Sequence, residues 1–250
     1  MRLFLNPNQF IDTNKPLDVS MNLVASPKNV RAWYVDEPKF TAVRKNGFLG
    51  SVSEGGDVNF RDIFFNPHGH GTHTECYGHI SQEIYSVNKS LTAFFFKATL
   101  VSICPKVLAN GDQIISAEQF PTDMNKEFCE AILIRTLPNE LEKCNKNYSG
   151  SNPPYLDLSL IPLFNTLDVK HLLLDLPSVD REEDKGELAF HHAFWEVPKN
   201  PNSERTITEL IFVASSIKDG NYLLEMQLAP FENDASPSRP VLYELFSVGN

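Results

Sequence analysis

Four of the seven histidines in the chain lie in the segment NPHGHGTHTECYGHIS, residues 66–81, together with a glutamate and a cysteine. Imidazole nitrogens and carboxylate oxygens are common ligands of zinc, manganese and iron(II). A metal ion held by such groups polarises a carbonyl group and lowers the pKa of a bound water. The composition of this segment therefore predicts a metal-dependent catalytic site.

The spacing within the segment selects among the candidate ligands. Residues two apart point to the same face of an extended strand, so a strand through His73, Glu75 and His79 would aim all three side chains one way. A buried glutamate–histidine network without a metal is the alternative, but three polar residues in register favour a metal or catalytic site. Cys76 falls on the other face, where we expect a small buried residue rather than a ligand.

Two further histidines, His68 and His70, fall on the opposite face if the strand is regular. Gly69 and Gly71 permit backbone angles that other residues avoid, so either histidine can swing inward. The alternative is that both are surface loop residues. The residues alone leave this choice open.

The segment GTHTECYGH resembles the HxGTHxDxPxH signature of the cyclase family of metal-dependent hydrolases, whose best-known members are kynurenine formamidase and isatin hydrolase. Residues 71–73 match GTH, and His79 matches the final histidine. Glu75 replaces the aspartate of the signature, and Tyr77 replaces the proline. The first metal-binding histidine of the signature corresponds to Gly69, so this ligand is missing at its usual position.

The resemblance implies a divalent metal, zinc or manganese, bound to His73 and Glu75. It also implies that His70 or His68 replaces the ligand missing at Gly69, and we expect His70 in that role. The final histidine of the signature, His79, is then a catalytic or second-metal residue.

Later segments extend the resemblance over nearly the whole chain. FHHAFWEVP and ITELIFV resemble the family's distal histidine and glutamate segments, which hold a second metal or position the reacting water. The resemblance thus implies catalytic roles for Glu209 and for His191 or His192, and the spacing to Phe194 and Trp195 favours His191. Three polar residues follow LLL in LLLDLPSVD, and we expect loop architecture from them, with local backbone hydrogen bonds: Asp175, Ser178 and Asp180.

The elements that must position these residues are short. Segments 94–103, 130–136, 169–174, 206–215 and 221–231 are rich in β-branched and other apolar residues and predict strands. LSLIPLFNTL predicts a short helix with Ser159 as N-cap. Helices alternate with strands only in part, which predicts an α/β or α+β domain on a mixed sheet. The resemblance implies one barrel-like or swivelling β/β/α cyclase-type domain over residues 1–250.

Charge and composition exclude several classes of protein. A net charge of −10 without a basic cluster argues against nucleic acid and acidic membrane surfaces. Phosphate-binding loops of the GxGxxG and GKT types are absent. Neither a signal-peptide core nor a run of ~20 apolar residues occurs, and the four cysteines form no CxxC pair. We therefore expect a cytoplasmic protein that acts on a small molecule, and the resemblance implies a homodimer.

The function implied by the resemblance is hydrolysis of a C–N bond in an amide, formamide or cyclic amide. Kynurenine formamidase activity, an arylformamidase reaction of tryptophan catabolism, is the usual assignment in the family. Two alternatives remain. One is a cyclase or dehydratase that acts on a carbonyl substrate. The other is a catalytically inactive small-molecule-binding protein, which Gly69 favours.

Overall fold

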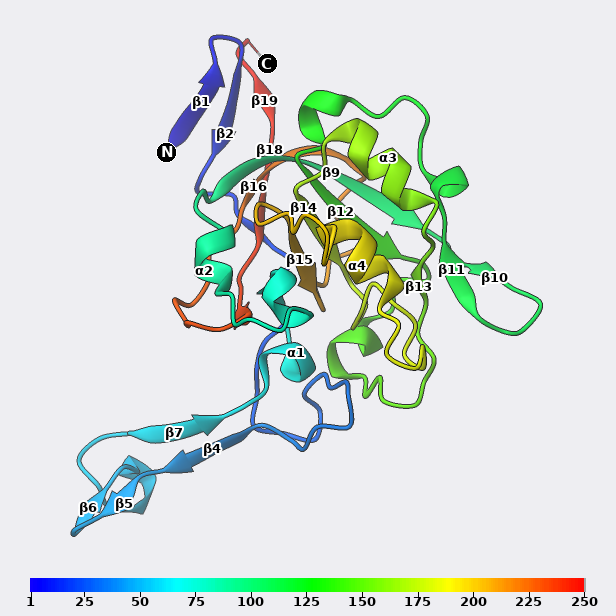
Figure 1. Cartoon of the computed structure of the whole chain (residues 1–250). Helices are drawn as coiled ribbons and strands as arrows, with labels where there is room; N and C mark the ends of the chain where they lie inside the picture. Colours follow the sequence, from blue (N-terminus) through cyan, green and yellow to red (C-terminus); the bar gives the residue numbers. More distant parts are fainter. Residues whose placement is uncertain (250) are drawn as a thin grey trace.

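The centre of the molecule is one curled sheet in the form of a half-barrel (Figure 1). The computed structural model describes residues 1–249. The strand order in the sheet is β17-β8-β15-β14-β12-β9-β16-β18-β3. The strands are β3 (Leu17–Asp18), β8 (His73–Glu75), β9 (Phe95–Ile103), β12 (Ala131–Thr136), β14 (His171–Leu174), β15 (Thr206–Glu209), β16 (Gly220–Glu225), β17 (Ala235–Pro237) and β18 (Val241–Glu244).

The sheet is mixed, with a parallel centre and antiparallel flanks. Strands β9, β12, β14 and β15 run parallel, whereas β8, β17, β16, β18 and β3 pair antiparallel with their neighbours. Every residue of β12, β14 and β15 is buried. Near-continuous apolar runs such as AILIRT are typical of central strands that are covered on both faces.

Two helices, α3 (Leu160–Leu167) and α4 (Ala189–Trp195), cover one face of the sheet (Figure 1). Because side chains alternate along a strand, Ile132 and Ile134 pack with the helices, while Leu133 belongs to a second apolar cluster on the other face. Burial of each such side chain contributes about 1.5–3 kcal/mol. Both faces of the central strands are therefore held rigidly.

Smaller elements surround the sheet. The strands β1 (Arg2–Asn6), β2 (Gln9–Asp12) and β19 (Phe246–Ser247) form one small sheet, and β10 (Lys106–Val107), β11 (Gln113–Ile115) and β13 (Tyr155–Leu156) form another. The short helices are α1 (Pro67–His70), α2 (Val87–Ser90) and the 3-10 turns η1 (Val52–Glu54), η2 (Tyr77–His79), η3 (Ala117–Gln119), η4 (Lys126–Phe128) and η5 (Leu141–Asn145). None of the helices within residues 1–249 is long and apolar enough to cross a membrane.

A hairpin arm projects away from the body of the molecule (Figure 1). Its stem consists of β4 (Lys39–Ala42) paired antiparallel with β7 (Arg61–Phe64), and its tip contains β5 (Arg44–Lys45) and β6 (Phe48–Leu49). We call residues 39–64 the arm.

The predicted mixed α/β fold is confirmed, with differences in detail. The strand expected over residues 206–215 ends at Glu209, because Leu210 adopts a left-handed conformation (φ 54°) and turns the chain. Ser159 does precede α3, but its hydroxyl accepts a hydrogen bond from the backbone N–H of Ala117 (3.2 Å) and does not cap the helix.

Candidate metal centre

Strand β8 places two residues of the histidine-rich segment side by side on the sheet. It lies between β15 and β17, with His73 opposite Glu209 and Glu75 opposite Ile207. His73 and Glu75 are two residues apart, so both point to the face that α4 covers. His73 Nε2 lies 3.4 Å from Glu209 Oε2, and all three side chains are buried. The strand therefore brings these three predicted site residues together.

His79 reaches the same place by a different route. The predicted strand through His73, Glu75 and His79 is wrong for its last part, because the strand ends at Glu75 and the 3-10 turn η2 follows. The turn brings His79 Nδ1 to 4.0 Å from Glu75 Oε2. His79 is only partly buried, so it stands at the open side of the cluster.

Helix α4 supplies one histidine from above the sheet. His191 Nε2 lies 3.2 Å from Glu75 Oε1, and His191 Nδ1 lies 2.6 Å from Asp180 Oδ2. Asp180 also accepts hydrogen bonds from the backbone N–H groups of Phe190 and His191 at the beginning of the helix. The adjacent His192 hydrogen bonds to the carbonyl of Val197 instead (3.2 Å). Of the two candidates, His191 is therefore the one that faces the cluster.

The structure does not place His70 in the cluster, which corrects our expectation. The backbone N–H of Asn66 donates to His70 Nδ1 (2.7 Å), and His70 Nε2 lies 2.6 Å from the carbonyl oxygen of Asp36. Both ring nitrogens are thus engaged by the backbone. His68 takes the place by the cluster, with Nδ1 2.9 Å from Glu75 Oε2.

The one-turn helix α1 explains the exchange. A Cβ atom at Gly69 would lie 2.8 Å from Val35 Cγ2 and 3.2 Å from the carbonyl oxygen of Ala32. Residue 69 is therefore pressed against the loop of residues 32–35 and faces away from the cluster. The histidines on either side of Gly69 point in different directions: His68 points to Glu75, and His70 points to the backbone carbonyl of Asp36.

Burial and close charges shift the pKa values of the cluster. Burial lowers the pKa of His191, but Asp180 and Glu75 outweigh this effect and raise it to about 10. Burial raises the pKa of Glu209, and the negative charge of Glu75 raises it further. Burial opposes the charge of Glu75, yet His79, His191 and His68 hold its pKa well below the usual range. Glu75 is therefore the ionised carboxylate at the centre.

Three buried ligand atoms of the cluster lack a hydrogen-bond partner within residues 1–249: His73 Nε2, Glu75 Oε2 and Glu209 Oε1. His68 Nδ1 is close to Glu75 Oε2, but this contact does not have hydrogen-bond geometry. An unpartnered buried polar atom destabilises a protein by about 1–3 kcal/mol, which a cation ligated by these atoms would offset. The donor set therefore fits a divalent metal.

Two groups of side chains could hold a cation, and they share Glu75. One consists of His73, Glu75 and Glu209, and the other consists of His68, Glu75 and His79. The ligand atoms in each group lie within 4.8 Å of one another. Nitrogen and oxygen donors in this number suit zinc or manganese.

Comparisons with known proteins identify the family and the fold. The family model described as "Putative cyclase" matches residues 13–181, about two thirds of the chain. The chain belongs to the cyclase family. The matched segment includes α1, β8, η2 and Asp180, whereas His191 and Glu209 lie beyond it. No curated protein sequence matches the chain.

Solved structures share the fold of this cyclase-family protein at low sequence identity. A predicted metal-dependent hydrolase from Bacillus stearothermophilus is 15% identical, with a TM-score of 0.57 over 92% of this chain and 98% of that one. A structure described as a novel cyclase is 12% identical, with a TM-score of 0.63 over 94% and 88%. An isatin hydrolase bound to the product analogue thioisatinate is 10% identical, with a TM-score of 0.59 over 93% and 94%. These likenesses show the fold.

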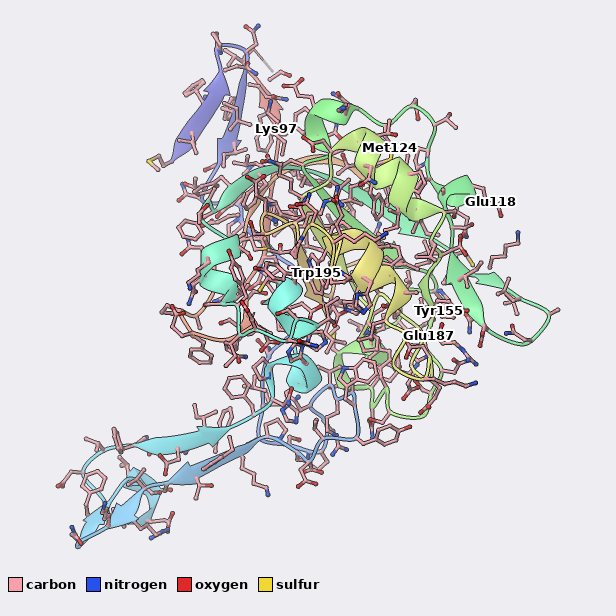
Figure 2. The ribbon with its side chains drawn as sticks, viewed as in Figure 1. Lys97, Glu118, Met124, Tyr155, Glu187 and Trp195 are labelled. Carbon is pink, nitrogen blue, oxygen red and sulfur yellow. The ribbon has the colours of Figure 1, made fainter. Side chains whose placement is uncertain are left out.

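A cavity of about 320 Å³ opens onto the candidate metal centre of this cyclase-family protein. Its lining includes His79, His191 and Glu209, together with Trp33 and Leu188 as apolar walls. A larger cavity of about 400 Å³, which Asp180 helps to line, lies between residues 155–158 and the charged loop 181–187. Tyr155 and Glu187, both labelled in Figure 2, line this second cavity. The smaller cavity is the one that contains the candidate chemistry.

The loop that carries Trp33 is held in an uncommon conformation. Trp33 (φ 60°) and Tyr34 (φ 56°) both adopt left-handed backbone angles, which cost about 1–3 kcal/mol each in residues other than glycine. Hydrogen bonds from Tyr34 N to Ser149 Oγ (2.9 Å) and from Ala32 N to the carbonyl of Gly69 (3.0 Å) hold this loop in place. Among the aromatic residues near the motif, Trp33 thus lines the cavity, whereas Trp195 packs in the core.

Sequence reasoning missed two carboxylates of the site. Asp180 was expected to serve only the local loop, but it also binds His191. Asp234, in the loop before β17, lies 2.8 Å from His68 Nε2 and 3.4 Å from His79 Nδ1. The signal for Asp180 was its place in the loop that follows the buried strand β14. The sequence around Asp234 carries no comparable signal.

Proposed function

We propose that this protein is a metal-dependent hydrolase that acts on the C–N bond of an amide, a formamide or a cyclic amide. The observation that carries the proposal is the set of three unpartnered buried ligand atoms beside a cavity, within residues 1–249. Membership of the cyclase family supports it, as do the fold neighbours described as a metal-dependent hydrolase and an isatin hydrolase.

The proposed ligands are His73, Glu75 and Glu209, and His68, in the place where we had expected His70, belongs to the second group, which shares Glu75. A divalent cation in this site, zinc or manganese, supplies positive charge that polarises a carbonyl group and favours ionisation of water. Because Glu75 is ionised and common to both groups, its carboxylate attracts the cation in either position. His191 holds Glu75 from the other side, with Nε2 3.2 Å from Oε1.

We assign proton transfer to His79, which lies at the open side of the candidate metal centre. His79 lines the cavity and is partly exposed, so it can take a proton from water and deliver it to a leaving nitrogen. Glu209 also lines the cavity, where its carboxylate is proposed as a ligand of the cation rather than as the proton donor. His191 orients Glu75 and is itself oriented by Asp180.

The cavity favours a small flat substrate. About 320 Å³ is bounded by the indole of Trp33 and by Leu188, while Asn66 and Ser178 offer hydrogen bonds. An aromatic formamide or a lactam fused to an aromatic ring matches this combination of apolar walls and few polar groups. An arylformamidase reaction of the kynurenine formamidase kind, and with it a role in tryptophan catabolism, is therefore the first activity to assay.

The test is elemental analysis of the purified protein, combined with hydrolysis of aryl formamides, lactams and lactones with added zinc or manganese. We expect about one or more bound metal ions and hydrolysis of an amide, both lost in His73→Ala. His192→Gln is the matched control, because this histidine lies on the same helix and binds Val197. A protein that takes up neither metal would contradict the proposal.

We further propose that the protein forms a homodimer through the arm. The arm exposes several large apolar side chains in the single chain, among them Phe48, Val58, Phe60, Ile63 and Phe64, the last with 65% of its surface exposed. Large apolar side chains gathered on one exposed element favour an interface. Light scattering should give twice the chain mass, and replacing Phe60, Ile63 and Phe64 with serine should give the monomer.

A further inference from the structure

We propose that Asp234 is a positioning residue of the metal centre, which holds the ring of His68 so that its Nδ1 faces Glu75 and the cation. This inference rests on the proposed function only in requiring that a cation binds. Asp234 Oδ2 lies 2.8 Å from His68 Nε2. A carboxylate accepts hydrogen bonds, so Nε2 donates its proton to Asp234, and Nδ1, 2.9 Å from Glu75 Oε2, is the nitrogen that can bind a cation once it has released its own proton.

His68 needs a hydrogen-bond partner such as Asp234 because it lies one residue before the position of the family's histidine. Residue 69, the position of the family's histidine, is closed by Val35 and the carbonyl oxygen of Ala32. His68 reaches the centre from a helix of one turn and keeps 19% of its side chain exposed, so packing alone does not fix its ring. A carboxylate on the second nitrogen of a ligating histidine fixes the ring and makes the ligand more basic.

Asp234 is itself fixed to the motif by the backbone. Its carbonyl accepts a hydrogen bond from the N–H of Cys76 (3.1 Å), the residue directly after Glu75. The next residues form β17, which pairs with β8. The carboxylate is thereby anchored to the same strand that carries Glu75, and the distance between Asp234 and His68 does not depend on a free loop.

Among the described residues, the side chain of Asp234 binds only to histidines of the site. Its partners are His68 and, at 3.4 Å, His79 Nδ1. Asp180 makes the equivalent contact to His191 on the other side of Glu75, but it also holds the beginning of α4. Two carboxylate–histidine pairs therefore flank Glu75, and the pair with Asp234 can be altered without loss of a helix cap.

The experiment measures cation affinity rather than turnover. Zinc affinity of the purified protein is determined by competition with a chelator, and the visible spectrum of the Co²⁺-loaded protein reports the ligand geometry. We expect Asp234→Ala to bind zinc about 10–100-fold more weakly and to change the Co²⁺ spectrum. Asp234→Asn should fall between Ala and the unaltered protein, because its amide oxygen still accepts a hydrogen bond. Thermal unfolding of the metal-free variants should stay close to that of the unaltered protein.

Two comparisons separate positioning from general effects. Glu232→Gln removes from the same loop a carboxylate whose hydrogen bond within residues 1–249 is to Asn88, and should leave affinity and spectrum unchanged. In a His68→Ala background, Asp234→Ala should add no further loss if it acts through His68.

The possible outcomes distinguish the two proposals. Unchanged affinity and spectrum in Asp234→Ala, with zinc bound by the unaltered protein, would overturn the positioning role alone. A protein that binds zinc, loses affinity in Asp234→Ala and hydrolyses no amide would overturn the proposed reaction and support the positioning role. A protein without affinity for zinc or Co²⁺ would overturn both.

Discussion

Two buried carboxylates of this molecule, Asp175 and Glu75, have very different surroundings. Asp175 follows β14 and accepts hydrogen bonds from the backbone N–H of Thr136 (2.9 and 3.1 Å) and from Lys143 Nζ (2.8 Å). Glu75 retains an oxygen without a hydrogen-bond partner in the part of the chain that the structure describes, and two neighbours of Glu75 do likewise. Satisfied charges support the fold, whereas unsatisfied charges beside a cavity indicate a ligand.

The largest effect is expected from removing the central charge. Glu75→Gln should abolish metal binding and lower the rate of amide hydrolysis by about 10³-fold or more, since a catalytic metal contributes several kcal/mol to the transition state. Metal analysis and kcat/KM check both. Asp157→Asn, in a partly exposed loop, controls for loss of one negative charge. If Glu75→Gln kept the metal content of the unaltered protein, Glu75 would not be a metal ligand, and the contrast with Asp175 would be wrong.

The next largest effect is expected at Asp175, the carboxylate whose hydrogen bonds are all made within the fold. Lys143→Met leaves Asp175 buried without its cation, and the free energy of unfolding should fall by about 3–5 kcal/mol. Urea unfolding measures this, and metal content should stay unchanged. The double variant Lys143→Met, Asp175→Asn should recover part of the stability. If the single variant lost metal but not stability, Asp175 would belong to the site rather than to the fold.

A smaller effect is expected where the sequence departs from its family. Gly69→His restores the signature histidine, but its Cβ would meet Val35 and the carbonyl oxygen of Ala32. We expect about 1–3 kcal/mol of destabilisation by urea unfolding and no gain in zinc affinity. Gly69→Ala separates the effect of the Cβ atom from that of the imidazole. Tighter zinc binding in Gly69→His would show that residue 69 can turn toward the centre.

The smallest effect extends the comparison to histidines. His171 lies buried in β14, with Nδ1 2.8 Å from Thr206 Oγ1 and its ring 4.0 Å from that of Phe96. Burial lowers its pKa from 6.5 to about 3. The folded state then binds the proton less well than the unfolded state, so stability is full above pH 6.5 and falls at lower pH, by at most about 1.4 kcal/mol per pH unit until pH 3. Urea unfolding at pH 7 and pH 5 should show a smaller difference in His171→Gln, and an equal difference would contradict the assignment.

The sequence predicted the parts of the fold and site that follow from local pattern. Alternation along β8 placed His73 and Glu75 on one face, and apolar runs located β9, β12 and β14. The resemblance to the cyclase family supplied His191 and Glu209, which the structure brings to the same cluster.

What the sequence could not predict depends on contacts between distant segments. The choice of His68 over His70 follows from the packing of α1 against Val35, which no spacing rule contains. The route of His79 depends on the 3-10 turn after the strand. Asp234 lies 166 residues after His68 and enters the site only because β17 pairs with β8. Local pattern therefore identified the strand of the site, and tertiary packing decided its ligands.

The position of β8 between β15 and β17 has a consequence for the synthesis of the chain. When the histidine-rich segment leaves the ribosome, neither Glu209 nor Asp234 has yet been made, and β8 has no neighbour on either side. A nascent chain thus offers histidines and one glutamate without the carboxylates that complete the cluster. Uptake of a cation in the native geometry must wait until β17 has been synthesised and paired, so fragments that end before residue 235 should fail to acquire the metal.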